Sequence, residues 1–519
     1  MTKRGAMAMF TQWGWGGAIL ALSLLLRLYR LTDPSIWSDE GFSLEMVTYP
    51  LPAIWGLSGQ DVHPPLYYVI LKGWVELAGS NNLWWTRGLS VLCGVLDVGL
   101  GMWLMVLVST RRAAVVAGLL LACLPIAVRY SQDARMYSML GTFLLGATIA
   151  LVYWVKCPSK KRYLMVYALS MVAGFYTHYF AIFAACSHWL YLALIRLPRL
   201  GGHRHIERLG WWLANGAMAI LYSPWLPMML KQFAKFGRGW IQPLSIETVP
   251  SAFWKFVIGN DGRANGALIF WVLPLVCVAI AIRVLSRAGG QYRFNVLIVV
   301  CGLFTIIATL CISLITPVFV ERYLFFSALM MPMIVALALE KVKSSAWFTS
   351  ALVLILAIEV CGLNNIYRQQ HMLNNPYRIA DNQLGRLMAY FDTVSISGDV
   401  LVAGDVYVFY AAKYYGTKGR ALFLYTPPAE SGASGRPTGA DFYALMVKYP
   451  EDTYIDNLDD FNTENNRVWY LPYTHQPEGH RLKIPTTWRL IRHEPGGDNA
   501  LDLYVICSPQ AQDLPEACE

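Results

Sequence analysis

Apolar residues fall in runs long enough to cross a membrane, and short polar connectors separate the runs. A transmembrane helix needs about 20 mostly apolar residues. The runs lie at 13–29, 86–108, 113–128, 136–155, 163–178, 180–195, 211–230, 266–283, 294–316, 323–340 and 346–363. Lys3 and Arg4 precede the first run as in a signal peptide, but no small-residue cleavage site follows, so we expect a retained helix. The pattern predicts an α-helical polytopic membrane protein with about 11 transmembrane helices.

Every second connector between these runs is basic and almost free of acids. The basic connectors are Arg111 with Arg112; Lys156 with Lys160, Lys161 and Arg162; residues 196–208; Arg283, Arg287 and Arg293; and Lys341 with Lys343. Basic connectors face the cytoplasm, so we expect the N-terminus inside and the C-terminal tail outside. The other connectors then share the outer face, with Asp39, Glu40, His63, Asp133, Arg135, His178, Glu321 and Arg322.

From about Asn364 the charge rises and no spanning run remains. Residues 399–403 and 502–506 read as short buried strands, 378–391 as a helix and 427–439 as a Pro-, Gly- and Ser-rich loop. A tail of this size can bury its own core. We therefore predict a transmembrane domain at 1–363, with an outer loop at 30–86, and a small extracytoplasmic α/β domain at 364–519.

The composition supports this interpretation. The chain has 519 residues, of which 56% are hydrophobic and only 14% charged, against about 25% charged in soluble proteins. The net charge of +9 comes mainly from the connectors, so it sets topology and predicts no nucleic-acid partner. No two of the ten cysteines form a C-x-x-C pair. Whether Cys507 and Cys518 in the tail are bridged stays open.

Two adjacent acids, Asp39 and Glu40, follow the first run in the stretch W-S-D-E. Neighbouring side chains diverge, so one acid could act as general base while the other binds a metal or the acceptor. The alternative is that both acids cap the N-terminus of an interfacial helix.

His63 opens the stretch H-P-P-L-Y-Y, in which the two prolines hold the chain extended and can start a helix. The histidine could ligate a divalent cation together with an acid from the first stretch. Equally, it could satisfy backbone groups under the Pro-Pro turn.

Two arginines suit a lipid-linked phosphate, because a guanidinium is bidentate and always charged. Arg135 lies two residues after Asp133 and two before Tyr137, and Arg322 precedes Tyr323. The alternatives are snorkelling of Arg135 to lipid headgroups and a local pair of Arg322 with Glu321. No Gly-rich phosphate loop supports a soluble nucleotide donor.

The order of these motifs resembles the C-superfamily membrane glycosyltransferases, the family of the protein O-mannosyltransferases and the lipid A aminoarabinose transferase. The motifs are W-x-D-E, H-P-P-L-Y-Y, Arg87, S-x-D/E-x-R-x-Y and the late Arg322 with Tyr323. The resemblance covers residues 13–340 and not the C-terminal domain.

The resemblance implies an inverting transfer of a sugar, hexosyl or pentosyl, from a polyprenyl-phosphate donor to an acceptor at the outer face of a bacterial inner membrane. Asp39 takes the place of the family's catalytic base, Glu40 of its acidic neighbour, and Asp133 of its second acid. Arg87, Arg135, Tyr137, Arg322 and Tyr323 fall in the donor site. Some relatives bind a divalent metal cation, for which His63 and Glu40 are the candidate ligands.

The rival functions are a transporter or flippase of a lipid-linked saccharide, and a glycan polymerase or ligase that uses an oligosaccharide donor. A transporter would predict internal repeats and ionisable residues near mid-membrane, whereas no repeat is evident and the conspicuous charges lie in connectors. The sugar, the acceptor (protein, lipid or glycan) and the oligomeric state are left open by the sequence.

Overall fold

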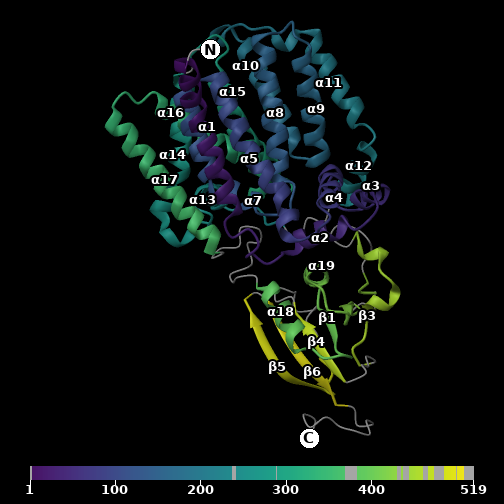
Figure 1. Ribbon diagram of the computed structural model, residues 1–519. Helices are drawn as coiled ribbons and strands as arrows, with labels where there is room; N and C mark the ends of the chain where they lie inside the picture. Colours follow the sequence, from purple (N-terminus) through teal and green to yellow (C-terminus); the bar gives the residue numbers. More distant parts are fainter. Residues whose placement is uncertain are drawn as a thin grey trace. The chain divides into compact units, whose positions relative to one another are not determined.

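The computed structural model describes residues 3–235, 241–287, 289–368, 383–428, 434–436, 444–459, 466–472, 484–497 and 499–507. Its contacts form two compact units, drawn in Figure 1. The helical unit comprises Met1–Leu31 and His63–Arg368, and the sheet unit comprises Thr32–Val62 and Gln369–Glu519. The sequence division kept the whole outer loop 30–86 with the helices, whereas the contacts group Thr32–Val62 with the C-terminal residues.

The helical unit has helices at all eleven predicted runs. They are α1 (Lys3–Leu28), α5 (Leu83–Val108), α6 (Arg111–Cys123) with α7 (Pro125–Ser131), α8 (Tyr137–Lys156), α9 (Arg162–Thr177), α10 (Ala181–Arg196), α11 (Leu209–Tyr222) with α12 (Leu226–Lys235), α14 (Ala267–Ser286), α15 (Phe294–Ser313), α16 (Phe325–Glu340) and α17 (Ser345–Arg368). Two further helices, α4 (Leu66–Ala78) and α13 (Thr248–Val257), lie in connectors: α4 begins directly after the two prolines that were expected to start a helix, whereas α13 was not predicted.

Among the described residues, 6 helices are long and apolar enough to cross a membrane, or 7 if the bent pair α6 and α7 counts as one span. The predicted class, a mainly helical polytopic membrane protein, is confirmed at this level. The number of eleven spans and the direction in which they cross stay predictions.

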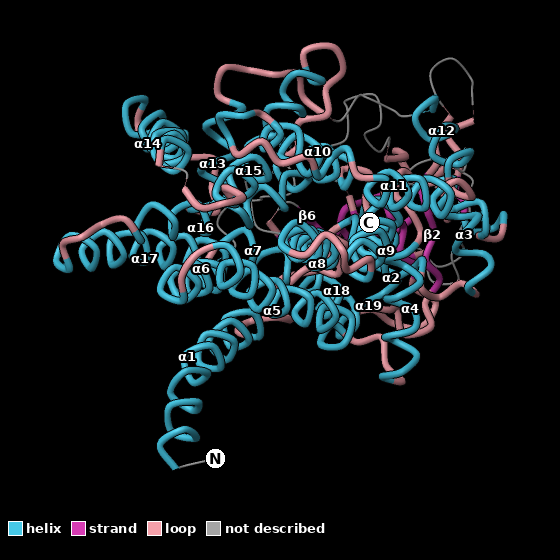
Figure 2. The backbone as a smooth tube through the Cα atoms, turned by 90° about the horizontal axis from the view of Figure 1, so that it is seen from above, coloured by secondary structure: helices cyan, strands magenta, loops and turns pink. Residues whose placement is uncertain are grey.

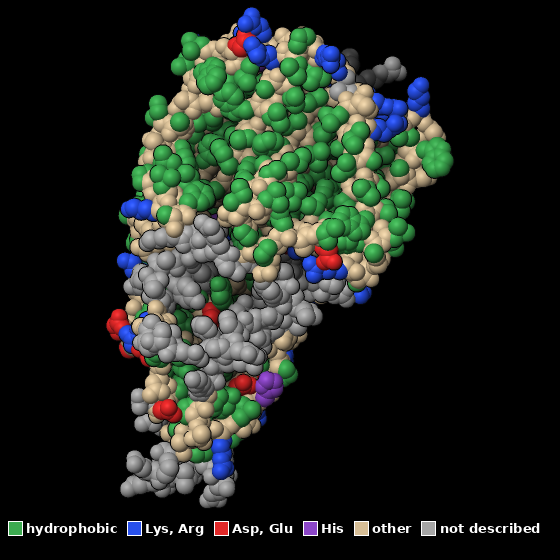
Figure 3. All heavy atoms as spheres, turned by 180° about the vertical axis from the view of Figure 1, so that it is seen from behind, with side chains coloured by type: hydrophobic (Ala, Val, Ile, Leu, Met, Phe, Trp, Pro, Cys, Tyr) green, Lys and Arg blue, Asp and Glu red, His purple; other side chains and the backbone are tan. Residues whose placement is uncertain are grey.

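The outer surface of the helical unit is apolar, as a lipid-facing surface requires. Within the most apolar stretch of each helix, the buried share of the residues is 78% in α8, 22% in α14 and 17% in α17. Figure 2 accordingly shows α14 and α17 at the margin, with α8 inside. Hydrophobic side chains cover most of the face of this unit in Figure 3, and Lys and Arg gather at one end.

Contacts between the basic connectors show that all five lie at the same end of the helices. The contacts join Ser109 to Glu340, Arg112 to Phe348, Lys156 to Phe294, His203 to Gln291 and His205 to Val155, and Lys156 also donates to the Leu107 carbonyl and so links the two groups. The sorting of basic connectors predicted from the sequence therefore exists in the fold. We call this the basic end of the helical unit.

A buried arginine supports the sharpest bend in the helical unit, the 58° break between α6 and α7. Pro125 has no N–H, so it cannot bond the Leu121 carbonyl four residues earlier. Arg27 of α1 donates to this carbonyl at 3.4 Å and to that of Ala122 at 3.1 Å. Its Nε lies 3.1 Å from the Ser131 hydroxyl at the end of α7. Arg27 thus replaces the hydrogen bonds that the proline removes.

Gln132 ties the end of α7 back to α1. Its Nε2 donates to the carbonyls of Arg27 at 2.9 Å and Tyr29 at 2.8 Å. Nearby, Asp97 of α5 accepts a hydrogen bond of 2.8 Å from Thr142 of α8. Arg27 and Asp97 are buried ionisable residues inside the helices, and the sequence predicted a role for neither.

The sheet unit contains one six-stranded mixed sheet of order β3-β2-β1-β4-β6-β5. Its elements are α2 (Ser38–Met46), α3 (Leu51–Gln60), α18 (Leu384–Val394), β1 (Val400–Ala403), α19 (Val406–Tyr415), β2 (Ala421–Tyr425), β3 (Tyr454–Ile455), β4 (Arg467–Leu471), β5 (Trp488–Gly496) and β6 (Asn499–Ile506). Strands β3, β2, β1 and β4 are parallel, and β6 runs antiparallel to both β4 and β5. In register, Val402 pairs with Phe423 and with Tyr470.

The C-terminal α/β domain predicted from the sequence is confirmed. The two expected strands appear as β1 and β6, and the expected helix 378–391 appears in part as α18 from Leu384, since residues 378–382 lie outside the described residues. Of the predicted loop 427–439, residues 429–433 and 437–439 lie outside the described residues. Cys507 is disulfide-bonded, but Cys518 lies outside the described residues, so their pairing stays a prediction.

His205 gives the basic end a dependence on pH. Its Nε2 bonds the Val155 carbonyl at 3.0 Å, and burial lowers the pKa of His205 to about 4. The unfolded pKa is about 6.5, so its contribution to stability is present above about pH 6.5 and is lost as the pH falls toward 4. We expect His205→Gln, which can keep the donor, to weaken the fall in thermal midpoint between about pH 7 and pH 5. The same fall in the variant as in the wild type would contradict this assignment.

Candidate functional site

The connector between α7 and α8 carries the central candidate residues. Asp133 is fully buried and Arg135 is 2% exposed, and the Arg135 N–H bonds the Asp133 carbonyl at 2.7 Å. Because Arg27 and Gln132 hold the preceding helix end, these two side chains are presented on a fixed turn. Tyr137 begins α8, and its ring lies 4.8 Å from that of Tyr130.

Three connectors of the helical unit meet at this turn. His63 Nε2 lies 3.4 Å from an Arg135 guanidinium nitrogen. The His63 ring is 5.9 Å from that of His178, which lies 6.0 Å from Tyr137 and 5.0 Å from Tyr323. The Arg322 guanidinium lies 5.5 Å from the Tyr323 ring. We call His63, Arg135, Tyr137, His178, Arg322 and Tyr323 the Arg–His–Tyr cluster.

His178, between α9 and α10, is buried and neutral in this cluster. Its pKa is well below the ordinary value, first because of burial and then because of the positive potential of His63, Arg135 and Arg322. The Phe180 N–H donates to His178 Nδ1 at 3.2 Å. The proton of the neutral ring therefore lies on Nε2, which can act as a donor.

Two buried arginines lie beside the neutral His178 in this cluster. Arg322 is 7% exposed, and its neighbour Glu321 pairs with Lys255 of α13 at 2.7 Å. A guanidinium group is always charged and offers several hydrogen-bond donors in a fixed plane. The cluster is therefore suited to bind an anion such as a phosphate.

Arg87 of α5 is buried and supports the backbone. A guanidinium nitrogen of Arg87 donates to the Leu31 carbonyl at 2.7 Å, close after the end of α1. This hydrogen bond accounts for the burial of the Arg87 side chain. A role of Arg87 in binding the lipid-linked sugar donor stays a prediction.

Asp39 and Glu40 lie in the first turn of α2, in the sheet unit. Glu40 is fully buried, whereas Asp39 is partly exposed. An acid in the first turn is stabilised by the helix dipole, so the alternative that both acids serve the helix N-terminus fits this position. It does not exclude chemistry at Asp39, because its carboxylate is partly accessible.

Helix α2 is anchored on α19. Lys413 donates to Glu45 Oε1 at 2.9 Å, and the Tyr449 hydroxyl donates to the same oxygen at 2.7 Å. Burial, and then the Glu45 carboxylate, raise the pKa of Tyr449 above its ordinary value. Gly41 allows the close approach, since an added Cβ would lie 3.0 Å from the Ala411 nitrogen. The acidic stretch is thus positioned by residues near the other end of the chain.

With this geometry described, known proteins can be compared. Residues 62–227 match the family model described as dolichyl-phosphate-mannose-protein mannosyltransferase. ArnT from Cupriavidus metallidurans bound to undecaprenyl phosphate is similar in structure, with a TM-score of 0.58 at 13% identity over 95% of this chain and 98% of that chain. Its apo state gives a TM-score of 0.59 at 13% identity over 96% and 99%. The chain has the fold of the C-superfamily membrane glycosyltransferases.

A second glycosyltransferase of this fold is the archaeal oligosaccharyltransferase AglB from Archaeoglobus fulgidus in complex with an inhibitory peptide and a dolichol-phosphate. It matches with a TM-score of 0.52 at 11% identity, over 80% of this chain and 64% of that chain. No curated protein matches the chain by sequence. The resemblance predicted from the motifs is confirmed, and the likeness now extends over the C-terminal unit, for which the sequence showed none.

Two residues of this glycosyltransferase fold were missed or undervalued by sequence reasoning. His178 was placed on the outer face with His63 and Arg135 but was assigned no role, although that shared face was a usable signal. Glu45 was not singled out, since an acid five residues after Glu40 on a short polar helix reads as part of a solvated helix face. Its burial depends on Lys413 and Tyr449, which no local pattern connects with it.

A metal site is not supported by the donor set. The described residues contain no group of three or more His, Cys, Asp and Glu side chains that could hold a metal ion. His63, one candidate ligand, has its Nε2 beside the Arg135 guanidinium, and a cation in that place would be repelled. We therefore derive no step through a metal, and the predicted ligands His63 and Glu40 stay untested.

The close approach of α2 to α19 yields a prediction. Gly41→Ala should displace α2, because overpacking costs roughly 1–3 kcal/mol, and amide hydrogen exchange in α2 should accelerate about tenfold or more. Gly56→Ala is the matched control, since nothing lies within 4 Å of its added Cβ. Equal exchange in the two variants would show that the packing at Gly41 does not hold α2.

Proposed function

We propose that the protein is an inverting glycosyltransferase that moves a sugar from a polyprenyl-phosphate carrier to an acceptor. The observation that carries the proposal is the Arg–His–Tyr cluster, in which Arg135 and Arg322 are buried around the neutral His178. The fold supports it, because the similar ArnT was solved with undecaprenyl phosphate.

The proposed donor site binds the lipid phosphate. Arg135 and Arg322 offer fixed, always-charged donors, and His178 adds a neutral Nε2–H. Charge builds on the phosphate oxygen as the glycosidic bond breaks, so donors already in place stabilise the transition state more than the ground state. Tyr137 and Tyr323 line the cluster and limit its contact with water, which strengthens these interactions.

The proposed general base is Asp39. The acceptor hydroxyl attacks the anomeric carbon, the bond from that carbon to the phosphate oxygen breaks, and the polyprenyl phosphate leaves with the electron pair. The acceptor proton passes to the Asp39 carboxylate. One displacement inverts the anomeric centre and needs no second carboxylate as nucleophile. Glu40 supports Asp39 from the next position, and Asp133 helps to orient Arg135.

We further propose that the cluster faces the periplasm of a bacterial inner membrane. Basic connectors gather at the other end of the helices, and such connectors face the cytoplasm. The 364–519 domain would then be extracytoplasmic, where the disulfide at Cys507 is stable. The acceptor, whether protein, lipid or glycan, arrives from that side.

Loss of the base should abolish transfer. Asp39→Asn keeps the size of the side chain but cannot take a proton, so we expect turnover in proteoliposomes to fall by about 10²–10⁴-fold, with donor binding and thermal stability unchanged. Asp33→Asn, the same change at an exposed carboxylate of the same segment, should remain active. Wild-type turnover by Asp39→Asn would overturn the assignment.

The arginines of the cluster should control donor affinity. A hydrogen bond to a charged group is worth about 1.5–3 kcal/mol, so Arg135→Ala and Arg322→Ala should each weaken binding of a polyprenyl-phosphate sugar by roughly 10–100-fold. Arg263→Ala removes an exposed arginine that pairs with Glu247 and serves as the control. Unchanged affinity in both cluster variants would remove these arginines from the donor site.

A further inference from the structure

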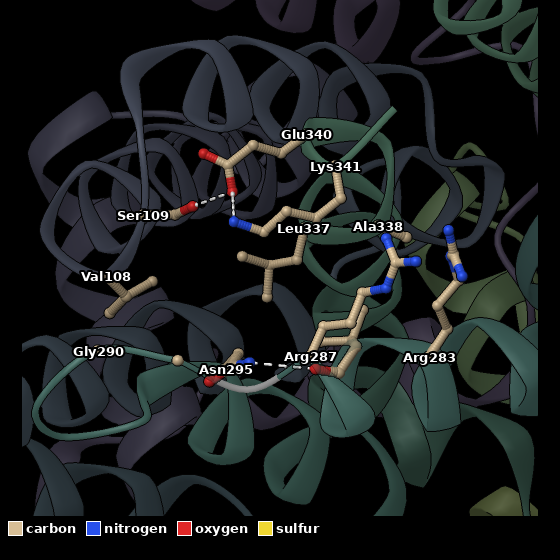
Figure 4. A pocket seen from close by; sticks show the side chains of 12 residues that line it. Val108, Ser109, Arg283, Arg287, Gly290, Asn295, Leu337, Ala338, Glu340 and Lys341 are labelled. Atoms are coloured by element: carbon tan, nitrogen blue, oxygen red, sulfur yellow. Dashed lines mark hydrogen bonds and ion pairs between the residues drawn. The ribbon is translucent and has the colours of Figure 1, made fainter. Parts of the chain in front are cut away.

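A second polar site lies at the basic end, away from the Arg–His–Tyr cluster. A partly open cavity of about 190 Å³ lies between the ends of α5, α14, α15 and α16. Its polar lining comes from Ser109, Arg283, Arg287, Asn295, Glu340 and Lys341 (Figure 4). No role in sugar transfer accounts for these residues, since they lie in the basic connectors.

The cavity is cationic. Arg283 lies in the last turn of α14 and Arg287 is the C-cap residue four positions later, and Figure 4 shows their side chains next to each other. In the part of the chain that the structure describes, neither guanidinium pairs with a carboxylate. Like charges at this spacing repel each other by about 0.2–0.5 kcal/mol. An anion bound between the two guanidinium groups would attract both of them and remove this repulsion.

The single acid of the lining does not neutralise the two arginines. Glu340 accepts a hydrogen bond of 2.8 Å from Ser109 and lies 3.8 Å from Lys341. The negative charge of Glu340 is therefore already offset by Lys341, which also lines the cavity. The first turn of α15 also lines the cavity, but α5, α14 and α16 end there with their C-termini, so the attraction for an anion comes from the basic side chains and not from the helix dipoles.

Asn295 gives a second, independent indication of a ligand. Its Nδ2 donates to the Val284 carbonyl at 3.1 Å, which fixes the orientation of the amide. Its Oδ1 is buried and has no hydrogen-bond partner among the described residues. A buried acceptor of this kind is costly to leave unsatisfied. The cavity therefore suits a ligand that is anionic and also donates a hydroxyl.

Size and surroundings favour a lipid headgroup. The volume is below the roughly 300–1,000 Å³ of sites for drug-sized ligands, so it suits a phosphate group with little attached. Ile282 and Leu285, beside the arginines on α14, are 61% and 39% exposed and would contact an acyl chain. Basic pockets between membrane helices on the cytoplasmic side are suited to anionic headgroups.

We propose that this cavity binds a phosphate group bearing a free hydroxyl, supplied by an anionic phospholipid headgroup of the phosphatidylglycerol type. Arg283 and Arg287 hold the phosphate, and Asn295 Oδ1 accepts from the hydroxyl. Inorganic phosphate carries the same chemistry without the acyl chains and is the alternative source.

Native mass spectrometry of the delipidated full chain in neutral detergent tests the site, with phosphatidylglycerol, phosphatidylcholine and inorganic phosphate as separate ligands. At a contribution of about 1 kcal/mol for each basic residue, Arg283→Gln with Arg287→Gln should weaken phosphatidylglycerol binding about 30-fold. Lys160→Gln with Lys161→Gln removes the same charge from another basic connector and should bind as the wild type does. Ala338→Phe, which fills the cavity without changing charge, should also abolish the site.

The outcomes separate the sources. Loss of phosphatidylglycerol binding in the arginine and Ala338 variants only, with no phosphate binding, establishes a lipid site. Displacement of the lipid by inorganic phosphate establishes a site for the phosphate group itself. Equal losses in the arginine and lysine variants, unchanged binding in Ala338→Phe, or equal binding of phosphatidylcholine would overturn the proposal. Binding is compared only among variants whose thermal midpoint of unfolding equals that of the wild type, so that unfolding is not mistaken for loss of the site.

Discussion

The contact between Arg27 and the break at Pro125 is the constraint on which the helical unit depends. A break in a membrane helix exposes carbonyls that lipid cannot satisfy, and Arg27 donates to two of those released here. The same side chain reaches Ser131, and Gln132 returns two hydrogen bonds to the α1 backbone. A buried charge that would be expensive by itself thus fixes the direction of the chain into the turn with Asp133 and Arg135.

The sheet unit imposes a comparable constraint on the acidic stretch. Helix α2 follows the first apolar run in sequence, yet its packing partner is α19, where the buried Glu45 pairs with the partly exposed Lys413. The position of Asp39 therefore depends on a fold that is completed more than three hundred residues later. This dependence gives the C-terminal unit a role besides any contact with an acceptor: it holds the proposed base.

The two ends of the helical unit concentrate positive charge in different ways. In the Arg–His–Tyr cluster the arginines are buried among aromatic rings, so an anion there is shielded from water and bound strongly. At the basic end Arg283 and Arg287 are exposed, so an anion there exchanges with the headgroup region. The first environment suits chemistry on a phosphate ester, and the second suits reversible binding of a membrane component.

Much of the fold followed from local patterns in the sequence. Hydropathy located helices at all the predicted runs, the alternation of charge sorted the connectors between two ends, and the motif order indicated the glycosyltransferase fold. These signals are local because a lipid-facing helix must be apolar along its own length. Only the tertiary structure showed that α2 belongs to the sheet unit, that His178 joins His63 and Arg135, and that four helix ends line a cationic cavity. Those features depend on packing between segments far apart in the chain, which no local pattern of residues encodes.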